Sequence, residues 1–222
     1  MKALPDRHLD LGCGKFPRNP YSRGQLCGVD IRRLSEHPTF DYRVANLVID
    51  PIPYDDDSFG SVSAFDFIEH IPRILPTADG RDTYFPFIRL MDEVWRVLAP
   101  GGKFYALTPA YPHSEAFVDP THVNIITSNT HKYFCSDSPL ARMYGFKGQF
   151  TAIRTIWVYR AEAFEASKAI APRSISKRLA RSLRHLSRLL RGKDATSSYP
   201  PYFLWELQVV KPAETHIPAQ ET

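Results

Sequence analysis

The sequence contains little cysteine and no long apolar run. The three cysteines, Cys13, Cys27 and Cys135, are scattered without the spacing of metal ligands, which favours buried free thiols in a reducing compartment. No window of about 18 apolar residues is present to span a bilayer, and the first residues lack the apolar core of a secretory signal. The sequence also has no internal repeat. These absences predict a globular protein of the cytoplasm.

Basic residues are concentrated in one late segment. Between Arg173 and Lys193 there are eight Lys or Arg residues and no acidic residue, whereas the whole chain has a net charge of only +4. Residues 174–191 also carry apolar side chains at helical spacing, which predicts an amphipathic helix that either lies on an anionic membrane surface or packs on the domain. Aromatic residues are not interleaved with these charges, which argues against a nucleic-acid partner. The apolar stripe consists of Ile175, Leu179, Leu183, Leu186 and Leu190.

Strand-like and helix-like segments alternate through the first half of the chain, which predicts an α/β fold built on a parallel sheet. Residues 1–222 are expected to form one domain, with a helical basic insertion over 161–202 before the last strand. The predicted strands are His8–Leu11, Leu26–Asp30, Ser61–Phe67, Lys103–Thr108, Phe150–Arg160 and Phe203–Lys211.

The clearest helix is predicted over Thr83 to Leu98. Apolar residues at positions i, i+3, i+7 and i+10 define one face, and the Pro-Gly-Gly sequence at 100–102 ends the helix. This face consists of Ile88, Met91, Trp95 and Leu98.

The sequence "LDLGCG" places a glycine pair directly after the first predicted strand. Gly12 and Gly14 allow backbone N–H groups to approach a ligand closely, because no Cβ is in the way. A dinucleotide fingerprint would have a third glycine, but that place is taken by Pro17. Asp30 ends the next strand, where a carboxylate can accept hydrogen bonds from ribose hydroxyls, and Asp10 could bind a ligand ammonium or fix the turn through water. S-adenosylmethionine contains an ammonium and a ribose but no pyrophosphate, so these residues indicate it as the ligand.

Four segments together resemble the successive motifs of class I S-adenosylmethionine-dependent methyltransferases. They are "LDLGCG", "GVDI", "IPYDDDSFGSVSAFDFIEHI" and "EVWRVLAPGGKFYALTP", and they cover Leu9 to Pro109. The resemblance implies a Rossmann-like sheet of seven strands, mostly parallel with an antiparallel last strand, and helices on both faces. Phe16 stands where the family usually has a further glycine, which suits members with a shortened first helix.

The resemblance also assigns roles in binding the cofactor, S-adenosylmethionine. The glycine turn would hold the methionine end, with Asp10 near the ammonium, and Asp30 would bind the ribose. Asn46 and Leu47 align with the pair that reads the adenine edge, and Asp66 falls near the methionine group. The implied cofactor-binding residues are Asp10, Gly12, Cys13, Gly14, Asp30, Asn46, Leu47 and Asp66.

The methyl acceptor is predicted to bind at the loop "TPAYPHSEAFVDPTHVNIIT", which leaves the carboxyl end of a predicted strand. His122 carries an imidazole, which suits a general base, and Asp119 could orient this imidazole. In the alternative, Asp119 caps a turn and His122 packs under the loop. His70 is a further candidate base, although in this family it more often packs against the sheet.

The leading functional hypothesis is O-methylation of a hydroxyl on a glycan or lipid-linked saccharide. The segment "AFVDPTHVNIIT", followed by "YF", loosely resembles methyltransferases of bacterial polysaccharide and lipopolysaccharide assembly, and the basic helix would place the enzyme at the inner membrane face. Methylation of a small molecule or of a nitrogen atom, which needs no base, stays open, as does an RNA-binding methyltransferase. The acidic run Asp55–Asp57 is interpreted as a solvated turn, so no metal is expected.

Overall fold

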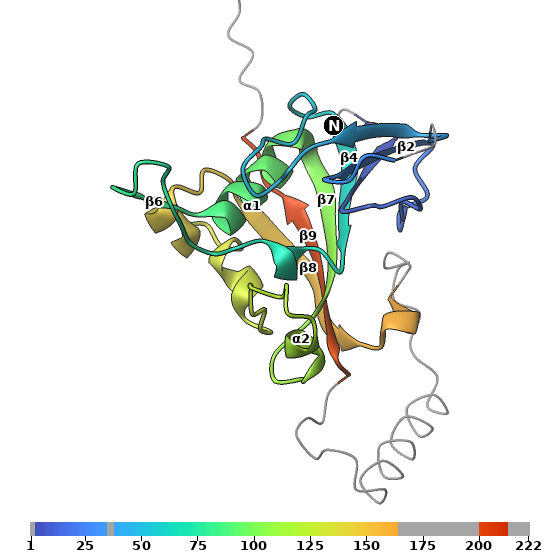
Figure 1. Cartoon of the computed structure of the whole chain (residues 1–222). Helices are drawn as coiled ribbons and strands as arrows, with labels where there is room; N and C mark the ends of the chain where they lie inside the picture. Colours follow the sequence, from blue (N-terminus) through green and yellow to red (C-terminus); the bar gives the residue numbers. More distant parts are fainter. Residues whose placement is uncertain (1–2, 35–37, 164–199, 213–222) are drawn as a thin grey trace, which may run out of the picture.

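A seven-stranded sheet forms the centre of the molecule (Figure 1). The computed structural model describes residues 3–34, 38–163 and 200–212. The strands lie in the order β3-β2-β1-β4-β7-β9-β8, and β9 alone runs antiparallel to its neighbours β7 and β8. The predicted mostly parallel sheet with an antiparallel last strand is confirmed. The strands are β1 (Arg7–Leu11), β2 (Gln25–Asp30), β3 (Asp41–Val44), β4 (Phe59–Phe65), β7 (Leu98–Pro109), β8 (Phe150–Val158) and β9 (Tyr202–Val209).

The sequence predicted six of these strands and missed β3. That strand has four residues at the edge of the sheet, and three of them are exposed, so it carries no apolar pattern. The prediction also began β7 at Lys103, because Pro100-Gly101-Gly102 was taken as a turn after the helix. In the structure β7 begins at Leu98, and the pairing register with β4 shifts across this segment, where Gly101 has a φ of +79°. The glycines thus mark a bulge within the strand.

The helix α1 (Pro86–Val97) begins three residues later than predicted. Thr83 and Tyr84 instead form β6, which pairs with β5 (Leu75–Pro76) in a separate hairpin. A proline at the first helical position suits this start, because its missing N–H would have no partner there. The fully buried face is also rotated from the predicted one, and Ile88 and Trp95 lie only half-buried at its edge. The buried residues of α1 are Pro86, Phe87, Leu90, Met91, Val94 and Val97.

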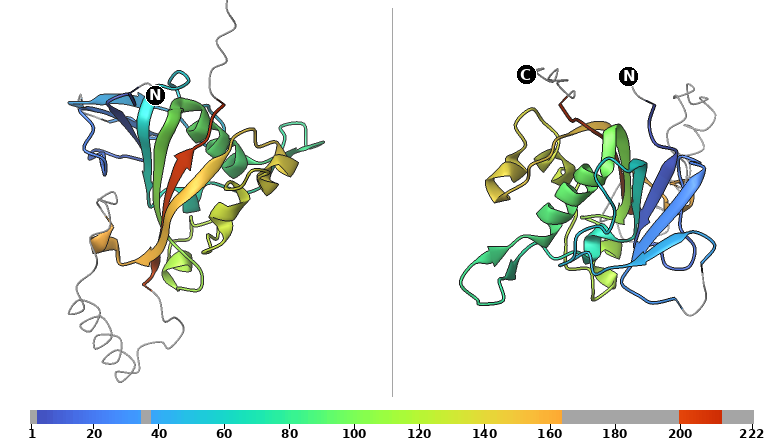
Figure 2. Two further views of the ribbon diagram at one scale, coloured as in Figure 1. Left: turned by 180° about the vertical axis from the view of Figure 1, so that it is seen from behind. Right: turned by 90° about the horizontal axis from the view of Figure 1, so that it is seen from above.

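The two faces of the sheet are covered differently. On one face, Phe104 of β7 belongs to the large core cluster that includes the buried residues of α1. On the other face, Tyr105 packs with Tyr21, from the loop between β1 and β2, and with Ala163, which follows the 3-10 helix η4 (Arg160–Glu162). Within the described ranges this second face carries loops and η4 but no α-helix (Figure 2). The β1–β2 connection, residues 12–24, contains no helix, so the expected shortened first helix is replaced by a loop.

The remaining described helices are short and lie in the connections around the carboxyl ends of β4 and β7. They are η1 (Ile68–His70), α2 (Glu115–Val118), η2 (Thr130–Tyr133) and η3 (Leu140–Tyr144). No helix in the described parts has both the length and the apolar character needed to cross a bilayer. The predicted amphipathic helix over 174–191, and all but the ends of the predicted insertion 161–202, lie outside the described residues. Of the three free thiols, Cys13 and Cys27 are buried as predicted, and Cys135 is half-buried.

Candidate active site

The carboxyl ends of β1, β2 and β4 meet at one edge of the sheet. Because β1 lies between β2 and β4, the turn at Gly12, the side chain of Asp30 and that of Asp66 follow three neighbouring strands. The strand order reverses direction here, since β2 and β3 lie to one side of β1 and β4 and β7 to the other. Ligands of open parallel sheets bind at such a switch point. This edge is therefore the candidate site.

The turn after β1 depends on its glycines. Gly12 and Gly14 have φ values of +66° and +55°, which side chains rarely tolerate. The N–H of Gly12 donates to the carbonyl of Val29 at 2.8 Å, so the turn is joined to the neighbouring strand. A Cβ on Gly12 would lie 2.5 Å from Cδ2 of Phe67. At Gly14 the nearest atom to an added Cβ is Nη2 of Arg32, at 3.1 Å. The surface of the turn is thus bordered by one aromatic ring and one guanidinium.

Asp30 is placed at the end of β2 as predicted, and its carboxylate is already hydrogen-bonded. It accepts from the N–H of Gly14 at 2.9 Å, from the N–H of Arg32 at 3.0 Å, and from Nε and Nη2 of Arg32 at 2.9 Å each. Burial raises the pKa of Asp30, but the hydrogen bonds from Arg32 and Gly14 outweigh it and hold the pKa below its usual value. The Arg32 side chain is 68% exposed. Its guanidinium can therefore move into water and free the carboxylate oxygens for a ligand hydroxyl.

Asp10 lies beneath the turn, fully buried, with both carboxylate oxygens used. The hydroxyl of Ser63 donates to Oδ1 at 2.6 Å, and the N–H of Arg18 donates to Oδ2 at 2.8 Å. Asp10 thus holds the chain after the turn by a direct hydrogen bond from Arg18. The sequence left two roles open, binding a ligand ammonium or fixing the turn through water, and the observed bond is closer to the second. Burial raises the pKa of Asp10 to about 7.

A buried histidine extends this network below the site. His8 Nε2 lies 2.8 Å from the hydroxyl of Ser63, and Nδ1 lies 2.8 Å from that of Ser61. Because the Ser63 proton goes to Asp10, the Ser63 oxygen accepts from Nε2–H, and Nδ1 accepts from Ser61. Burial lowers the pKa of His8 to about 3, so the ring is neutral.

The next predicted residues flank Asp30. Cys13 is buried against Gly28, and burial raises its pKa to about 12, so it serves packing. Asn46 and Leu47 follow β3, and the N–H of Ala45 donates to the carbonyl of Asp30 at 3.1 Å. The Asn46 amide oxygen accepts from the N–H of Val48 at 3.2 Å. The structure therefore brings the predicted adenine-side pair next to the predicted ribose ligand.

Asp66 follows β4 in a left-handed conformation, with a φ of +49°. Its N–H donates to the carbonyl of Leu107, which holds the turn to β7. Its Oδ2 accepts from Nη2 of Arg160 at 2.6 Å. Asp66 is thus at the candidate site as predicted, but its side chain pairs with η4, which the sequence did not indicate.

In the predicted acceptor loop, residues 108–127, Asp119 does not contact His122 in the way that the sequence suggested. Its Oδ1 accepts from the N–H of Thr121 at 2.8 Å and from the Thr121 hydroxyl at 2.7 Å, which is the turn-capping alternative. The same hydroxyl lies 2.9 Å from Nδ1 of His70. Because the Thr121 proton goes to Asp119, its oxygen accepts from His70 Nδ1–H. Asp119 therefore orients His70 through Thr121, and the expected orientation of His122 by Asp119 is corrected.

His122 and His70 lie side by side at the end of this loop. Their ring centroids are 4.8 Å apart in an edge-to-face arrangement, and both side chains are half-buried. His122 Nδ1 lies 3.3 Å from the carbonyl oxygen of Ala116, which fixes Nδ1 as the donor and leaves Nε2 with a lone pair. His70 was expected to pack against the sheet, but the structure brings it to the same position as His122.

Glu69 is a third group at this position and was missed in the sequence. It is 1% exposed, and its Oε2 accepts from the Thr108 hydroxyl at 2.9 Å. Among the described residues, Oε1 has no hydrogen-bond partner. Burial raises the pKa of Glu69 to about 8. Its only signal in the sequence is its place beside His70, shortly after the strand that precedes Asp66.

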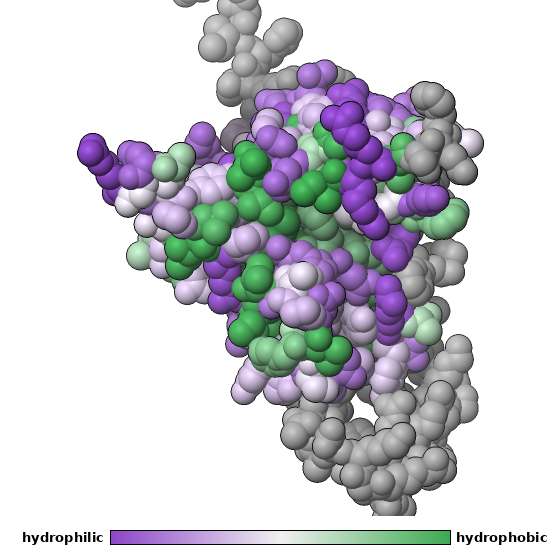
Figure 3. All heavy atoms as spheres, viewed as in Figure 1, coloured by the Kyte–Doolittle hydropathy of each residue, from purple (hydrophilic) through white to green (hydrophobic). Residues whose placement is uncertain are grey.

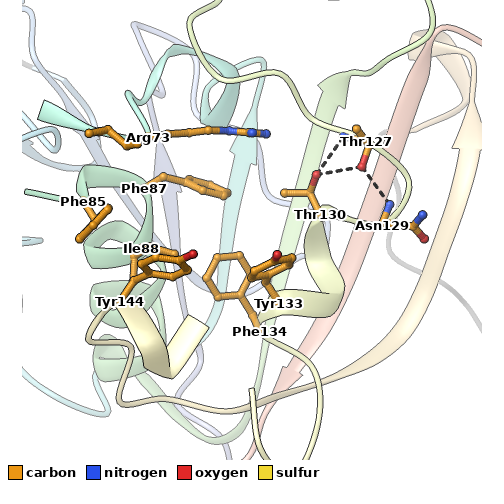
Figure 4. A pocket seen from close by; sticks show the side chains of 11 residues that line it. Arg73, Phe85, Phe87, Ile88, Thr127, Asn129, Thr130, Tyr133, Phe134 and Tyr144 are labelled. Carbon is orange, nitrogen blue, oxygen red and sulfur yellow. Dashed lines mark hydrogen bonds between the residues drawn. The ribbon is translucent and has the colours of Figure 1, made fainter. Parts of the chain in front are cut away.

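A hollow of about 420 Å³ lies beside the acceptor loop (Figure 4). Its wall is aromatic, with Phe87 from α1, Phe134 after η2, and Tyr144 from η3. Arg73 stands at its rim and donates from Nε to the amide oxygen of Asn124 at 2.6 Å. Asn124 belongs to the loop that carries His122, so the hollow and the histidines share one connecting segment.

The fold is shared with solved structures of low sequence identity. One is an S-adenosylmethionine-dependent methyltransferase from Archaeoglobus fulgidus, with 17% identity over 91% of this chain and 85% of that one and a TM-score of 0.53. Another is a candidate sarcosine dimethylglycine methyltransferase from Galdieria sulphuraria, with 14% identity, coverage of 93% and 78%, and a TM-score of 0.52. The chain has the class I methyltransferase fold.

This fold also carries other chemistry. The [4+2]-cyclase SpnF matches with 16% identity over 93% of this chain and 76% of that one, at a TM-score of 0.51. No protein-family model and no curated protein sequence matches this chain. The activity therefore has to be argued from the residues of the site.

Proposed function

We propose that this chain is an S-adenosylmethionine-dependent methyltransferase that methylates a hydroxyl group. The observation that carries the proposal is the pairing of the Gly12–Gly14 turn with the Asp30 carboxylate at the switch point of the sheet. Arg32 pairs with Asp30, is 68% exposed and borders Gly14, so its movement into water would open both groups together. Asn46 and Leu47 would contact the adenine, and Asp66 would lie near the methionine group.

The cofactor supplies a methyl group on a sulfonium, and the residues of the acceptor loop supply the proton acceptor. Methyl transfer to oxygen is helped by a base that takes the hydroxyl proton. His122 presents the lone pair of Nε2, because its Nδ1 is held by the Ala116 carbonyl. His70, oriented by Thr121, is the second base within reach. A base on this loop favours a hydroxyl over an amine, which needs none.

The acceptor proposed is a saccharide or a lipid-linked saccharide. The aromatic wall of the hollow suits the apolar face of a sugar ring or its lipid, while Arg73 and Asn129 offer polar contacts at the rim. Apolar side chains also gather on this face of the molecule (Figure 3). Ile74, which lines the hollow, is 65% exposed, and Met143, next to Tyr144 in the chain, is 77% exposed.

A peripheral membrane location would bring the enzyme to such an acceptor. The proposal rests on the sequence of residues 174–191, whose basic and apolar residues suit an anionic lipid surface. Sedimentation with liposomes tests it, because binding should rise with anionic lipid and weaken with salt. Changing Leu183 and Leu186 to serine should reduce the binding without changing the melting temperature. A lower melting temperature with unchanged sedimentation would place these leucines in the core.

Calorimetry with S-adenosylhomocysteine and NAD tests the cofactor. Binding of S-adenosylhomocysteine alone is expected, and binding of NAD alone would refute a methyltransferase. Incubation with methyl-labelled S-adenosylmethionine and a fractionated cell extract then tests the acceptor. Label in glycolipid or polysaccharide supports the proposed acceptor, whereas label confined to RNA, protein or amines contradicts it.

A further inference from the structure

Glu69, His70 and His122 are brought together from η1 and from the loop after α2, and we propose that they bind one divalent transition-metal ion. One ligand atom from each residue can be chosen so that all three lie within 4.8 Å of one another. Atoms bound to one such ion are about 3 to 4 Å apart, since each bond is about 2.0 to 2.2 Å long. The side chains therefore need to converge by about an ångström. This inference goes beyond the proposed function, which needs only a base.

The hydrogen bonds around the two histidines are those of metal ligands. Metal-bound histidines usually donate their other ring N–H to a carboxylate, a backbone carbonyl or water, which fixes the tautomer and raises the basicity of the ligating nitrogen. His122 donates from Nδ1 to the Ala116 carbonyl, and His70 donates from Nδ1 to Thr121, which in turn donates to Asp119. Both Nε2 lone pairs are left for the ion. A lone catalytic base would need only one such arrangement.

Glu69 supplies the negative ligand. A fully buried carboxylate with one oxygen held by Thr108 and the other without a partner is costly unless a cation or donor meets it. An ion bound between Oε1 and the two imidazoles would remove that cost. The three ligands would then be one carboxylate and two neutral imidazoles, which is a ligand set used for first-row transition metals with open positions.

The elements that carry the ligands are tied to each other. The N–H of Asn124 donates to the Glu69 carbonyl at 2.9 Å, and its side-chain amide donates to the Ile68 carbonyl at 3.0 Å. His122, two residues before Asn124, is thus held against η1 without the ion. This rigidity favours binding, because little chain entropy is lost when the ion arrives.

The donor set selects the class of ion. Imidazole ligands suit zinc, copper, iron or nickel, whereas magnesium, calcium and manganese prefer oxygen donors. Three protein ligands leave at least one position for water or a hydroxyl oxygen. If the proposed function holds, the ion would take the place of the free histidine base, because both Nε2 lone pairs would bind it and an acceptor hydroxyl at the open position would be made more acidic by the ion. The expectation of no metal considered the acidic run Asp55–Asp57 and not this cluster.

The test is a cobalt titration of the full chain after treatment with a chelator. Cobalt(II) bound by nitrogen and oxygen ligands gives visible absorption bands, and zinc should abolish them by displacement at a ratio of one ion per chain. His70→Ala and His122→Ala are expected to remove the bands, and Glu69→Gln to weaken binding. Thr121→Val, which breaks the supporting hydrogen bond of His70, should weaken cobalt binding about 10- to 100-fold. His113→Asn, a change in the same loop outside the cluster, should leave the bands unchanged.

Two results would overturn the metal site. One is wild-type protein without visible bands at excess cobalt, and the other is bands that survive in the double variant of His70 and His122. Circular dichroism of each metal-free variant shows whether it is folded, and His122→Gln replaces any alanine variant that is not. Binding of S-adenosylhomocysteine is measured on the same samples. Absence of this binding in the wild type would refute the proposed function, while its presence in a wild type without cobalt bands would refute only the metal.

Discussion

Replacing His8 by glutamine is expected to change how the free energy of unfolding depends on pH. In the native protein burial lowers the pKa of His8 from 6.5 to about 3. As the pH falls below 6.5, the unfolded chain takes up a proton that the native ring refuses, so stability is lost down to about pH 3. Between pH 8 and pH 5 this loss amounts to about 2 kcal/mol. The glutamine variant lacks this loss.

Asp10 acts in the opposite direction through the same network. Burial raises its pKa from 3.8 to about 7, so the native carboxyl holds its proton where the unfolded one has lost it. Its contribution is complete below pH 3.8 and is lost as the pH rises through 7, which makes the protein about 3 kcal/mol more stable at pH 5 than at pH 8. The two contributions nearly cancel in the wild type. The Asp10→Asn variant should therefore lose stability as the pH falls from 8 to 5, because only the His8 contribution remains. The His8→Gln variant should gain stability over the same range, because only the Asp10 contribution remains.

Urea unfolding at pH 8, 7, 6 and 5 measures both effects. The difference in free energy between each variant and the wild type removes the contributions of all other groups, and only its change with pH is used. From pH 8 to pH 5, the free energy of unfolding of His8→Gln relative to the wild type should rise by about 2 kcal/mol. That of Asp10→Asn relative to the wild type should fall by about 3 kcal/mol. Parallel curves for the wild type and His8→Gln would show that His8 is protonated in the native state, and would refute the buried neutral ring.

Further predictions concern the site. Asp30→Ala should weaken S-adenosylhomocysteine binding by about 2 to 4 kcal/mol in calorimetry, because charged hydrogen bonds to the ribose are lost; unchanged affinity would remove Asp30 from the site. Arg32→Ala should strengthen that binding up to about fivefold, since an exposed ion pair worth at most about 1 kcal/mol no longer competes, and weaker binding would make Arg32 a ligand contact instead. Gly12→Ala should lower the melting temperature more than the control Gly80→Ala, because Gly80 has a similar φ of +67° but nothing within 4 Å of an added Cβ. His122→Ala should reduce turnover far more than cofactor affinity, and full activity at neutral pH would exclude both of its proposed roles.

The strand pattern was predictable because most strands of this sheet are buried and therefore apolar. The edge strand β3 was not, since three of its four residues face solvent and no apolar periodicity marks them. The start of α1 was missed because Thr83 and Tyr84 are compatible with a helix by local pattern, while pairing with Leu75 and Pro76 decides their conformation. Each strand of this hairpin has only two residues, which is too short to show an alternating apolar pattern.

The residues proposed to bind the cofactor lie at strand ends, which sequence motifs locate well. The acceptor side depends on contacts between segments about 50 residues apart in the chain. His70 and Thr121 meet through one hydrogen bond, and Asn124 joins the two segments by binding the backbone of Ile68 and Glu69. Spacing within the loop suggested that Asp119 serves His122, because the two are three residues apart. The actual partner of Asp119 is Thr121, and only the folded chain brings His70 to it.

The ladder between β8 and β9 has a practical consequence for studying residues 159–201. Val158 and Tyr202 are paired directly across the two antiparallel strands, so the chain leaves β8 and enters β9 at neighbouring points. A turn of two to five residues is enough to join strands at such a position. A short linker that replaces residues 164–199 would keep every paired residue of the sheet, and it would also keep η4, whose Arg160 pairs with Asp66 at the candidate site. Such a shortened chain would separate the role of the basic segment from that of the candidate site, because the cobalt, cofactor and liposome measurements could each be repeated without the basic segment.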